Sequence, residues 1–179
     1  KSENTWANKV LYTNVNFPYL SKTDNYIYDG DATGRRTQAQ FFYDETTQYG
    51  NLTKTINLGE VNLTTGADIG TDKSTTEVTY HNNTTAWLLG LPKITTIKDN
   101  LNAQFAKTTF FYDSATSENT LPTKGYLTKK VDWAGDAVGT VHPFTQYTYD
   151  TIGNLLTTSD SNNSTTSISY DPTYKLFPL

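Results

Sequence analysis

Short stretches in which apolar and polar residues alternate recur along the chain, and most end at a turn-forming residue. The same four residues, Phe-Phe-Tyr-Asp, occur at 41–44 and at 110–113. Side chains at i and i+2 lie on the same face of a strand, so this alternation predicts half-buried β-strands. We expect strands at residues 9–15, 24–29, 38–44, 52–58, 75–81, 91–98, 107–113, 126–132, 145–150, 155–159 and 166–171.

A helical period of 3.6 residues is weak throughout. Residues 99–107 come nearest to it, but they include Asp99, Asn100 and Asn102, which favour turns. We interpret this segment as a turn that leads into the next strand. The pattern therefore predicts an all-β fold built from antiparallel hairpins.

A tyrosine followed by aspartate or histidine marks the end of six of these strands. The residue two positions before each tyrosine is apolar or aromatic, so each pair indicates one packed strand face. The six pairs are Tyr28-Asp29, Tyr43-Asp44, Tyr80-His81, Tyr112-Asp113, Tyr149-Asp150 and Tyr170-Asp171.

A glycine follows each central pair at a variable distance and opens a second strand, as in Gly50-Asn51-Leu52, Gly125-Tyr126-Leu127 and Gly153-Asn154-Leu155, with a weaker version at Gly90. Strand, turn, glycine and strand together predict a β-hairpin repeat in which glycine supplies a positive φ. We expect one repeat array over residues 1–179. Its approximate units are 24–58, 75–98, 107–132, 145–160 and an incomplete unit at 166–179.

Composition supports strands and excludes several classes of protein. The chain has 34 threonines, 16 asparagines and 13 tyrosines, which favour strands joined by polar turns. A net charge of -4 with scattered basic residues argues against nucleic-acid binding. No segment has the roughly 18 apolar residues of a transmembrane helix. The chain begins at Lys1 and contains no methionine, so we expect it to be a piece of a longer polypeptide.

Two segments resemble a known family. Residues 147–160, Tyr-Thr-Tyr-Asp-Thr-Ile-Gly-Asn-Leu-Leu-Thr-Thr-Ser-Asp, are similar to the YD repeat of the Rhs family, and residues 80–92 resemble its tryptophan-containing variant. That family includes bacterial Rhs polymorphic-toxin proteins, the B and C components of insecticidal toxin complexes, and teneurins. The resemblance implies a strip of a spiral β-shell that, in toxin members, encloses an effector. The family's self-cleaving aspartyl motif is not matched, because Asp171-Pro172 is followed by Thr173-Tyr174.

The resemblance gives the repeat residues a structural role rather than a catalytic one. They are Tyr43, Asp44, Gly50, Tyr80, Trp87, Gly90, Tyr112, Asp113, Gly125, Tyr149, Asp150, Gly153, Asn154, Leu155, Tyr170 and Asp171. We interpret the tyrosines as packing residues and the aspartates as turn residues that cap local N–H groups. A ladder of tyrosines that stacks on sugars is the alternative interpretation.

Catalytic and metal-binding patterns are weak. No acid pair is distinguished from the other turn aspartates, and His81 and His142 are far apart in the sequence. Asp29 and Asp31 precede Gly34 as in the start of a calcium loop, but Gln40 stands where the bidentate acid is required, so only a loose calcium site remains open. We expect no enzyme activity, no cofactor and no resident metal.

The leading hypothesis is therefore a non-enzymatic structural segment of a large secreted or cell-surface protein. Its expected partners are the remainder of its own polypeptide and an enclosed effector or toxin, with no nucleic acid and no membrane span. The alternative is an adhesin or carbohydrate-binding module that uses Tyr126, Trp133 and Trp87. Self-association through unpaired edge strands into filaments is also open.

Overall fold

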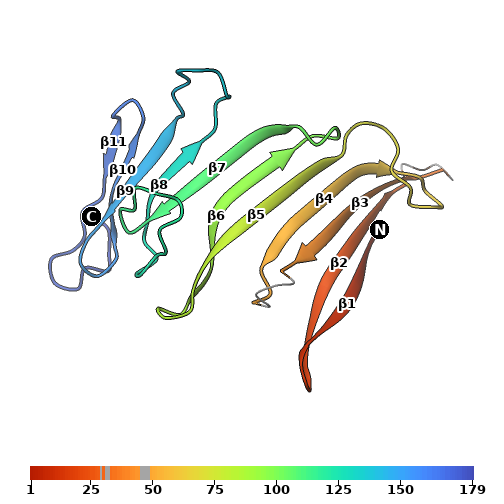
Figure 1. Ribbon diagram of the computed structural model, residues 1–179, viewed down its shortest axis with the longest axis horizontal. Helices are drawn as coiled ribbons and strands as arrows, with labels where there is room; N and C mark the ends of the chain where they lie inside the picture. The colour runs from red at the N-terminus through yellow and green to blue at the C-terminus, as the bar shows by residue number, and fades with distance from the viewer. Residues whose placement is uncertain (29, 31–32, 45–48) are drawn as a thin grey trace. The chain divides into compact units, whose positions relative to one another are not determined.

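The computed structural model describes residues 1–28, 30, 33–44 and 49–179 and confirms the all-β prediction. The described residues form eleven strands and no helix (Figure 1). The strands are β1 (Ser2–Tyr12), β2 (Val15–Ile27), β3 (Arg35–Tyr43), β4 (Leu52–Val61), β5 (Ser74–Asn83), β6 (Leu88–Lys98), β7 (Gln104–Tyr112), β8 (Leu127–Asp132), β9 (Phe144–Tyr149), β10 (Leu155–Asp160) and β11 (Thr165–Ser167).

The strands form one open antiparallel sheet in which spatial order follows chain order. Hairpins therefore succeed one another along the sheet. The repeat tyrosine and the residue two positions after the repeat glycine face each other across the strand pair, as Tyr112 faces Leu127 and Tyr149 faces Leu155. A register shift accompanies each of these pairs, so the ladder is irregular where the turn begins.

The N-terminal prediction was wrong. Residues 9–15 were expected to be one strand, but β1 ends at Tyr12 and β2 begins at Val15. Asn14 has a φ of 66° and turns the chain between them, because asparagine adopts the left-handed conformation more readily than most residues. Of the predicted strand at 24–29, residues 24–27 form the last part of the long β2, and Asp29 lies outside the described residues.

The C-terminal strand is shorter than expected. The predicted strand at 166–171 is represented by β11, and beyond it Tyr170 pairs with Pro178 in an isolated antiparallel bridge. The Leu179 N–H also donates to the Ser169 carbonyl. The last residues therefore fold back into a further hairpin.

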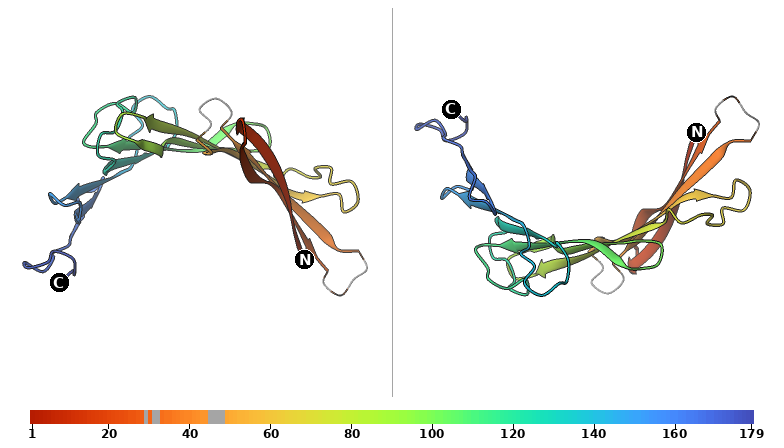
Figure 2. Two further views of the ribbon diagram at one scale, coloured as in Figure 1. Left: turned by 90° about the horizontal axis from the view of Figure 1, so that it is seen from below. Right: turned by 90° about the horizontal axis from the view of Figure 1, so that it is seen from above.

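The chain forms two compact units. Unit 1 contains residues 1–78 and 96–105, and unit 2 contains residues 79–95 and 106–179. In unit 1 the loop between β4 and β5 folds back beside β3, where the Arg36 guanidinium donates to the Leu63 carbonyl (Figure 2).

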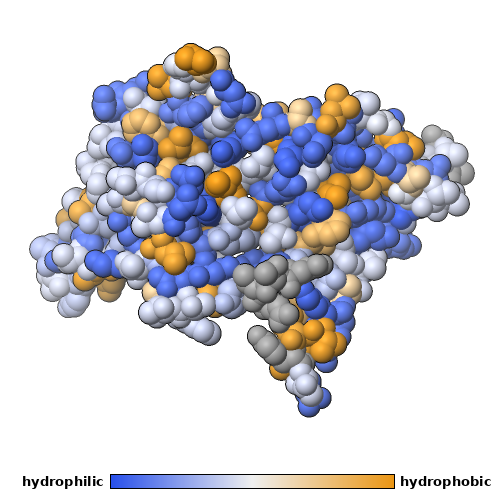
Figure 3. All heavy atoms as spheres, viewed as in Figure 1, coloured by the Kyte–Doolittle hydropathy of each residue, from blue (hydrophilic) through white to orange (hydrophobic). Residues whose placement is uncertain are grey.

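Burial is modest, as expected for strands of an open sheet. The buried apolar side chains include Val61 of unit 1, 2% exposed, and Tyr112 and Pro122 of unit 2, of which Tyr112 is 6% exposed. Most strand residues are half-buried. On the face drawn in Figure 3, hydrophobic residues are dispersed among polar ones. Hydrogen bonds at the turns therefore matter more here than in a domain with a thick core.

Candidate functional site

The aspartate after each repeat tyrosine closes a turn, and Asp150 shows this most simply. Its backbone N–H donates to the Asn154 carbonyl at 2.9 Å. Its carboxylate accepts from the backbone N–H groups of Ile152 and Asn154, both at 2.9 Å, and from the Asn154 side chain at 3.0 Å. We call this reciprocal pairing of an aspartate with the residue after the repeat glycine a turn clamp.

The same turn clamp closes a much longer loop at Asp113. Its backbone N–H donates to the Tyr126 carbonyl, thirteen positions along the chain. Its carboxylate accepts four backbone N–H groups at 2.7–3.1 Å, from Thr123, Lys124, Gly125 and Tyr126. Burial alone would raise the pKa of Asp113, but these four N–H donors hold the pKa below its ordinary value.

Two further aspartates follow the pattern. The Asp44 carboxylate accepts from the backbone N–H groups of Gly50 and Asn51, both at 3.3 Å. The Asp171 carboxylate accepts from Tyr174, Leu176 and Phe177, which lowers the pKa of Asp171. The interpretation of the aspartates as turn-capping residues agrees with all four turns.

The repeat tyrosines connect one hairpin to the next. The hydroxyl groups of Tyr112, Tyr149 and Tyr170 donate to the backbone carbonyls of Pro92, Leu127 and Leu155, at 2.9, 2.8 and 3.2 Å. Each acceptor stands two positions after the glycine of the preceding hairpin. We call this bond the tyrosine link. Burial raises the pKa of Tyr112 to about 12, so its hydroxyl keeps the proton that it donates.

The repeat glycines allow close approach between neighbouring hairpins in unit 2. A Cβ atom at Gly153 would lie 2.9 Å from the Tyr126 hydroxyl oxygen, and one at Gly125 would lie 3.4 Å from Leu91. Both glycines also have positive φ, of 97° and 83°. Glycine is therefore required at Gly153 for two independent reasons, its conformation and the space available.

The hairpin of β5 and β6 departs from the pattern at its aspartate position. His81 stands there, is buried and meets the Tyr112 ring edge-on, with the ring centroids 6.0 Å apart. Burial, with a smaller effect from Lys93, lowers the pKa of His81. The Gly90 N–H instead donates to the Asn82 side-chain oxygen at 2.9 Å. A neighbouring asparagine thus takes over part of the aspartate's role.

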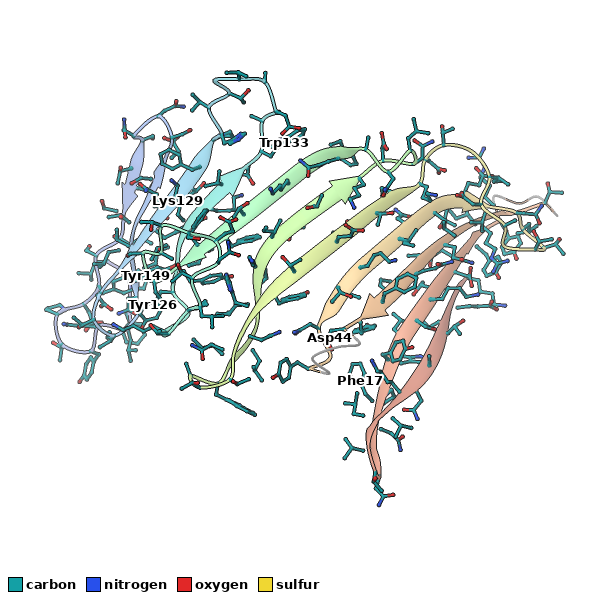
Figure 4. All side chains as sticks on the ribbon, in the orientation of Figure 1. Phe17, Asp44, Tyr126, Lys129, Trp133 and Tyr149 are labelled. Carbon is teal, nitrogen blue, oxygen red and sulfur yellow. The ribbon has the colours of Figure 1, made fainter. Side chains whose placement is uncertain are left out.

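The aromatic residues of the carbohydrate-binding alternative lie in three different settings. Tyr126 is stacked on Tyr149, with the ring centroids 5.2 Å apart (Figure 4). The Trp133 indole donates to the Asp136 carboxylate at 2.7 Å. Trp87 lies in the turn after β5 and is 77% exposed. Trp87 is therefore the best placed of the three for stacking on a ligand.

Sequence reasoning missed a buried charged cluster on β2 and β3. The Asp24 carboxylate, 3% exposed, accepts from the Arg36 guanidinium at 2.9 and 3.0 Å and from Gln38 at 2.8 Å. Lys22 lies 3.0 Å from the other Asp24 oxygen. Burial opposes ionisation of Asp24, but these donors lower its pKa. The available signal was the spacing of polar residues two apart on neighbouring strands.

An open hollow of about 590 Å³ lies in unit 2 between the loop after Asp113 and the strands beside it. Its lining includes Ser114, Thr116, Thr128, Lys129 and Tyr147. These groups offer hydroxyls and one ammonium, which suits a polar ligand. No carboxylate or imidazole belongs to its described lining.

Asp29 and Asp31, the possible calcium ligands, lie outside the described residues. Elsewhere, within the ranges that the structure covers, no three His, Asp or Glu side chains gather closely enough to hold a metal ion. His142, the other histidine, accepts from the Ala134 N–H at 3.2 Å through Nδ1.

Comparisons with known proteins found no sequence match and only a low structural similarity. No family model matches the chain, and no curated protein matches it. Among the residues described, no helix is long and apolar enough to cross a membrane. A crystal structure titled TcdB2-TccC3-Cdc42 is similar over 90% of this chain, at 15% sequence identity and a TM-score of 0.39. This chain spans only 8% of the length of that one.

Proposed function

We propose that this chain is a non-enzymatic structural segment of a large secreted or cell-surface protein of the YD-repeat type. Its hairpins would form part of a β-shell around a toxin or effector carried by the same polypeptide. The tyrosine link carries the proposal, because it joins each hairpin to the one before it at three successive positions in unit 2. Such nearest-neighbour bonding extends an array without needing a separate core.

The turn clamps support the same role. They hold the strand ends at a fixed register while the loops between clamp residues differ in length, from Asp150 to Asn154 in one hairpin and from Asp113 to Tyr126 in another. A sheet held in this way can carry loops of different lengths while the register of its strands stays the same. Reaction chemistry would instead demand one acid or base in an environment unlike the others, and the four clamping aspartates have similar surroundings.

Protease protection tests this proposal in the polypeptide encoded by the whole gene. If the repeats enclose an effector, a folded segment beyond the repeats resists proteinase K as long as the sheet is intact. Combined Tyr112→Phe, Tyr149→Phe and Tyr170→Phe changes should expose that segment, and the matched Tyr147→Phe variant should not. Equal digestion of all segments in the unmodified protein would contradict enclosure.

A binding function remains the second candidate, on the strength of the exposed Trp87. A glycan-array signal that is lost in Trp87→Ala and kept in Trp133→Ala would support it. Trp133 is the matched control because its indole is already bonded to Asp136. Without any signal from the unmodified chain, this candidate is abandoned.

A further inference from the structure

The last hairpin of unit 2 repeats the geometry of the hairpin formed by β7 and β8. Tyr170 faces Pro178 as Tyr112 faces Leu127. The Asp171 N–H donates to the Phe177 carbonyl as the Asp113 N–H donates to Tyr126. Phe177 and Pro178 are therefore the counterparts of Tyr126 and Leu127.

In the earlier hairpin both of these positions are covered by the next one. The Tyr126 ring stacks on Tyr149, and Gly153 lies close to it. The Leu127 carbonyl accepts the Tyr149 hydroxyl at 2.8 Å. The Tyr126 ring and the Leu127 carbonyl are thus both in contact with the following hairpin, through its tyrosine and its glycine.

In the last hairpin the same positions are exposed. Phe177 has 65% of its surface exposed, and Pro178 is exposed as well. The neighbouring Leu179 is 80% exposed. We call Phe177, Pro178 and Leu179 the terminal surface. An exposed aromatic ring beside exposed leucine is unfavourable in water, and both would gain from burial against a partner.

Pro178 restricts what that partner can be. The Phe177 carbonyl and the Leu179 N–H already bond back to Asp171 and Ser169. Pro178 itself has no N–H, so at this position the outer edge can only accept a hydrogen bond. Pro92 is the precedent within the chain, since its carbonyl accepts the Tyr112 hydroxyl. A tyrosine hydroxyl therefore fits the edge better than a regular strand does.

We infer that the terminal surface binds a further β-hairpin of the same design. Its first strand ends in a tyrosine whose hydroxyl donates to the Pro178 carbonyl. Its second strand begins after a left-handed glycine that lies on the Phe177 ring. This inference deepens the proposed structural function and rests on it, because it names the partner that extends the array.

The test adds such a hairpin to the intact chain. Since Leu127 corresponds to Pro178, Thr128 corresponds to Leu179, and a second copy of residues 129–160 joined directly after Leu179 continues the strand in register. Hydrogen exchange is then measured across the added copy. We expect slow exchange in its strands that correspond to β9 and β10.

Substitutions in the added copy identify the contacts. Tyr149→Phe there should speed exchange by about fivefold, the effect of one net hydrogen bond. Gly153→Val there should abolish protection, because the larger side chain cannot approach Phe177. Tyr147→Phe there is the matched control, since its hydroxyl is not part of the link, and it should leave the exchange rates unchanged.

Substitutions in the original chain test the receiving side. Phe177→Asp should remove the protection of the added copy, whereas Tyr174→Asp, an equally exposed position in the loop of the same hairpin, should not. Exchange of the added copy at unfolded-peptide rates, or equal effects of the two substitutions, would overturn the inference. The inference would also be overturned if the chain without the added copy self-associates and Phe177→Asp abolishes that self-association. The terminal surface would then bind a second copy of the chain.

Failure of this inference is distinguishable from failure of the proposed function. The experiment with the added hairpin measures protection from hydrogen exchange at one hairpin edge. The protease experiment measures protection of a distant segment in the full-length polypeptide. A protected effector with an undocked added hairpin would reject the terminal surface alone. Docking without protection would reject enclosure alone.

Discussion

The Tyr149 hydroxyl donates to the Leu127 carbonyl across 2.8 Å, although the two residues are 22 positions apart in the sequence. Leu127 opens β8 and Tyr149 ends β9, so the bond fixes the end of one strand against the beginning of its neighbour in the preceding hairpin. It lies where the regular ladder has ended, because the three residue pairs recorded between β8 and β9 run from Lys129 to Val131. The side chain therefore continues strand pairing beyond the backbone bonds.

Removing this hydroxyl should weaken unit 2 without disturbing its fold. We expect Tyr149→Phe to lower the free energy of unfolding by about 1 kcal/mol, the net value of one hydrogen bond. Urea unfolding followed by hydrogen exchange at β8 and β9 measures it. Tyr147→Phe should change the stability by less than about 0.5 kcal/mol. Equal losses in the two variants would argue against the link.

Alanine at Gly153 should cost more than alanine at another glycine with the same backbone conformation. Gly153 and Gly139 have φ values of 97° and 82°, but a Cβ at Gly139 meets nothing within 4 Å. Gly139→Ala should therefore cost about 1 kcal/mol, from the left-handed conformation alone. Gly153→Ala should cost about 2–3 kcal/mol, because Tyr126 must also move. Thermal unfolding of both variants separates the two contributions.

Neutralising Asp113 should loosen the longest clamped turn. Hydrogen bonds to a charged group are the strong ones, so Asp113→Asn should cost about 2 kcal/mol at neutral pH. Because its folded-state pKa lies below the ordinary 3.8, the carboxylate stabilises the fold above that value, and this stability is lost as the pH falls through the lowered pKa. The two proteins should converge in acid. Glu118→Gln in the same loop is the control and should show little change.

The buried cluster in unit 1 should be sensitive to loss of one partner. Asp24→Asn leaves the Arg36 guanidinium without its buried counter-charge, and we expect a loss of about 3–5 kcal/mol. Combining Asp24→Leu with Arg36→Met should recover much of this loss, because the charge that remains, on Lys22, is partly exposed to solvent. Chemical unfolding of Asp24→Leu, Arg36→Met and the double variant gives the coupling energy. Additive effects would show that the two side chains do not interact.

Mild acid should destabilise unit 2 through His81. Its pKa is lowered in the folded state by burial, so the neutral ring is favoured there. This contribution is complete above the ordinary value of 6.5 and decreases as the pH falls from there toward the lowered pKa. A His142→Gln background leaves His81 as the sole histidine. In that background, His81→Phe should abolish the loss of stability between about pH 7 and 5.5.

The alternation of apolar and polar residues predicted most strands because each one carries its own signal. Tyr-Asp and the following glycine also located the turns, since backbone capping by aspartate is a local interaction. The hairpin of β1 and β2 was missed because its turn, Thr13-Asn14, lacks both signals. The spacing of side chains along β1 could not reveal it either, because Trp6 and Val10 are exposed.

The contacts between hairpins could not be predicted from these patterns. Whether Tyr149 reaches Leu127, or Arg36 reaches Asp24, depends on the register between neighbouring strands, and a slip of one residue reverses every side chain. The register here depends on the irregular residue pairs beside the turns. The alternation of apolar and polar residues does not show where these irregular pairs occur. The burial of His81 against Tyr112 could likewise not be predicted, because it depends on contact with a neighbouring strand.

The reciprocal bonds of the turn clamp also make the strand register independent of the loop length, although these two properties are linked in most hairpins. In an ordinary hairpin the loop length sets the strand register, so an insertion shifts the partner strand. Here Asp113 is bonded at the base of its loop to residues 123–126, so the part of the loop before Pro122 can be replaced. Foreign peptides grafted between Ala115 and Leu121 would thus be displayed on an unchanged sheet, and related sequences are better aligned on the clamp residues than on loop length.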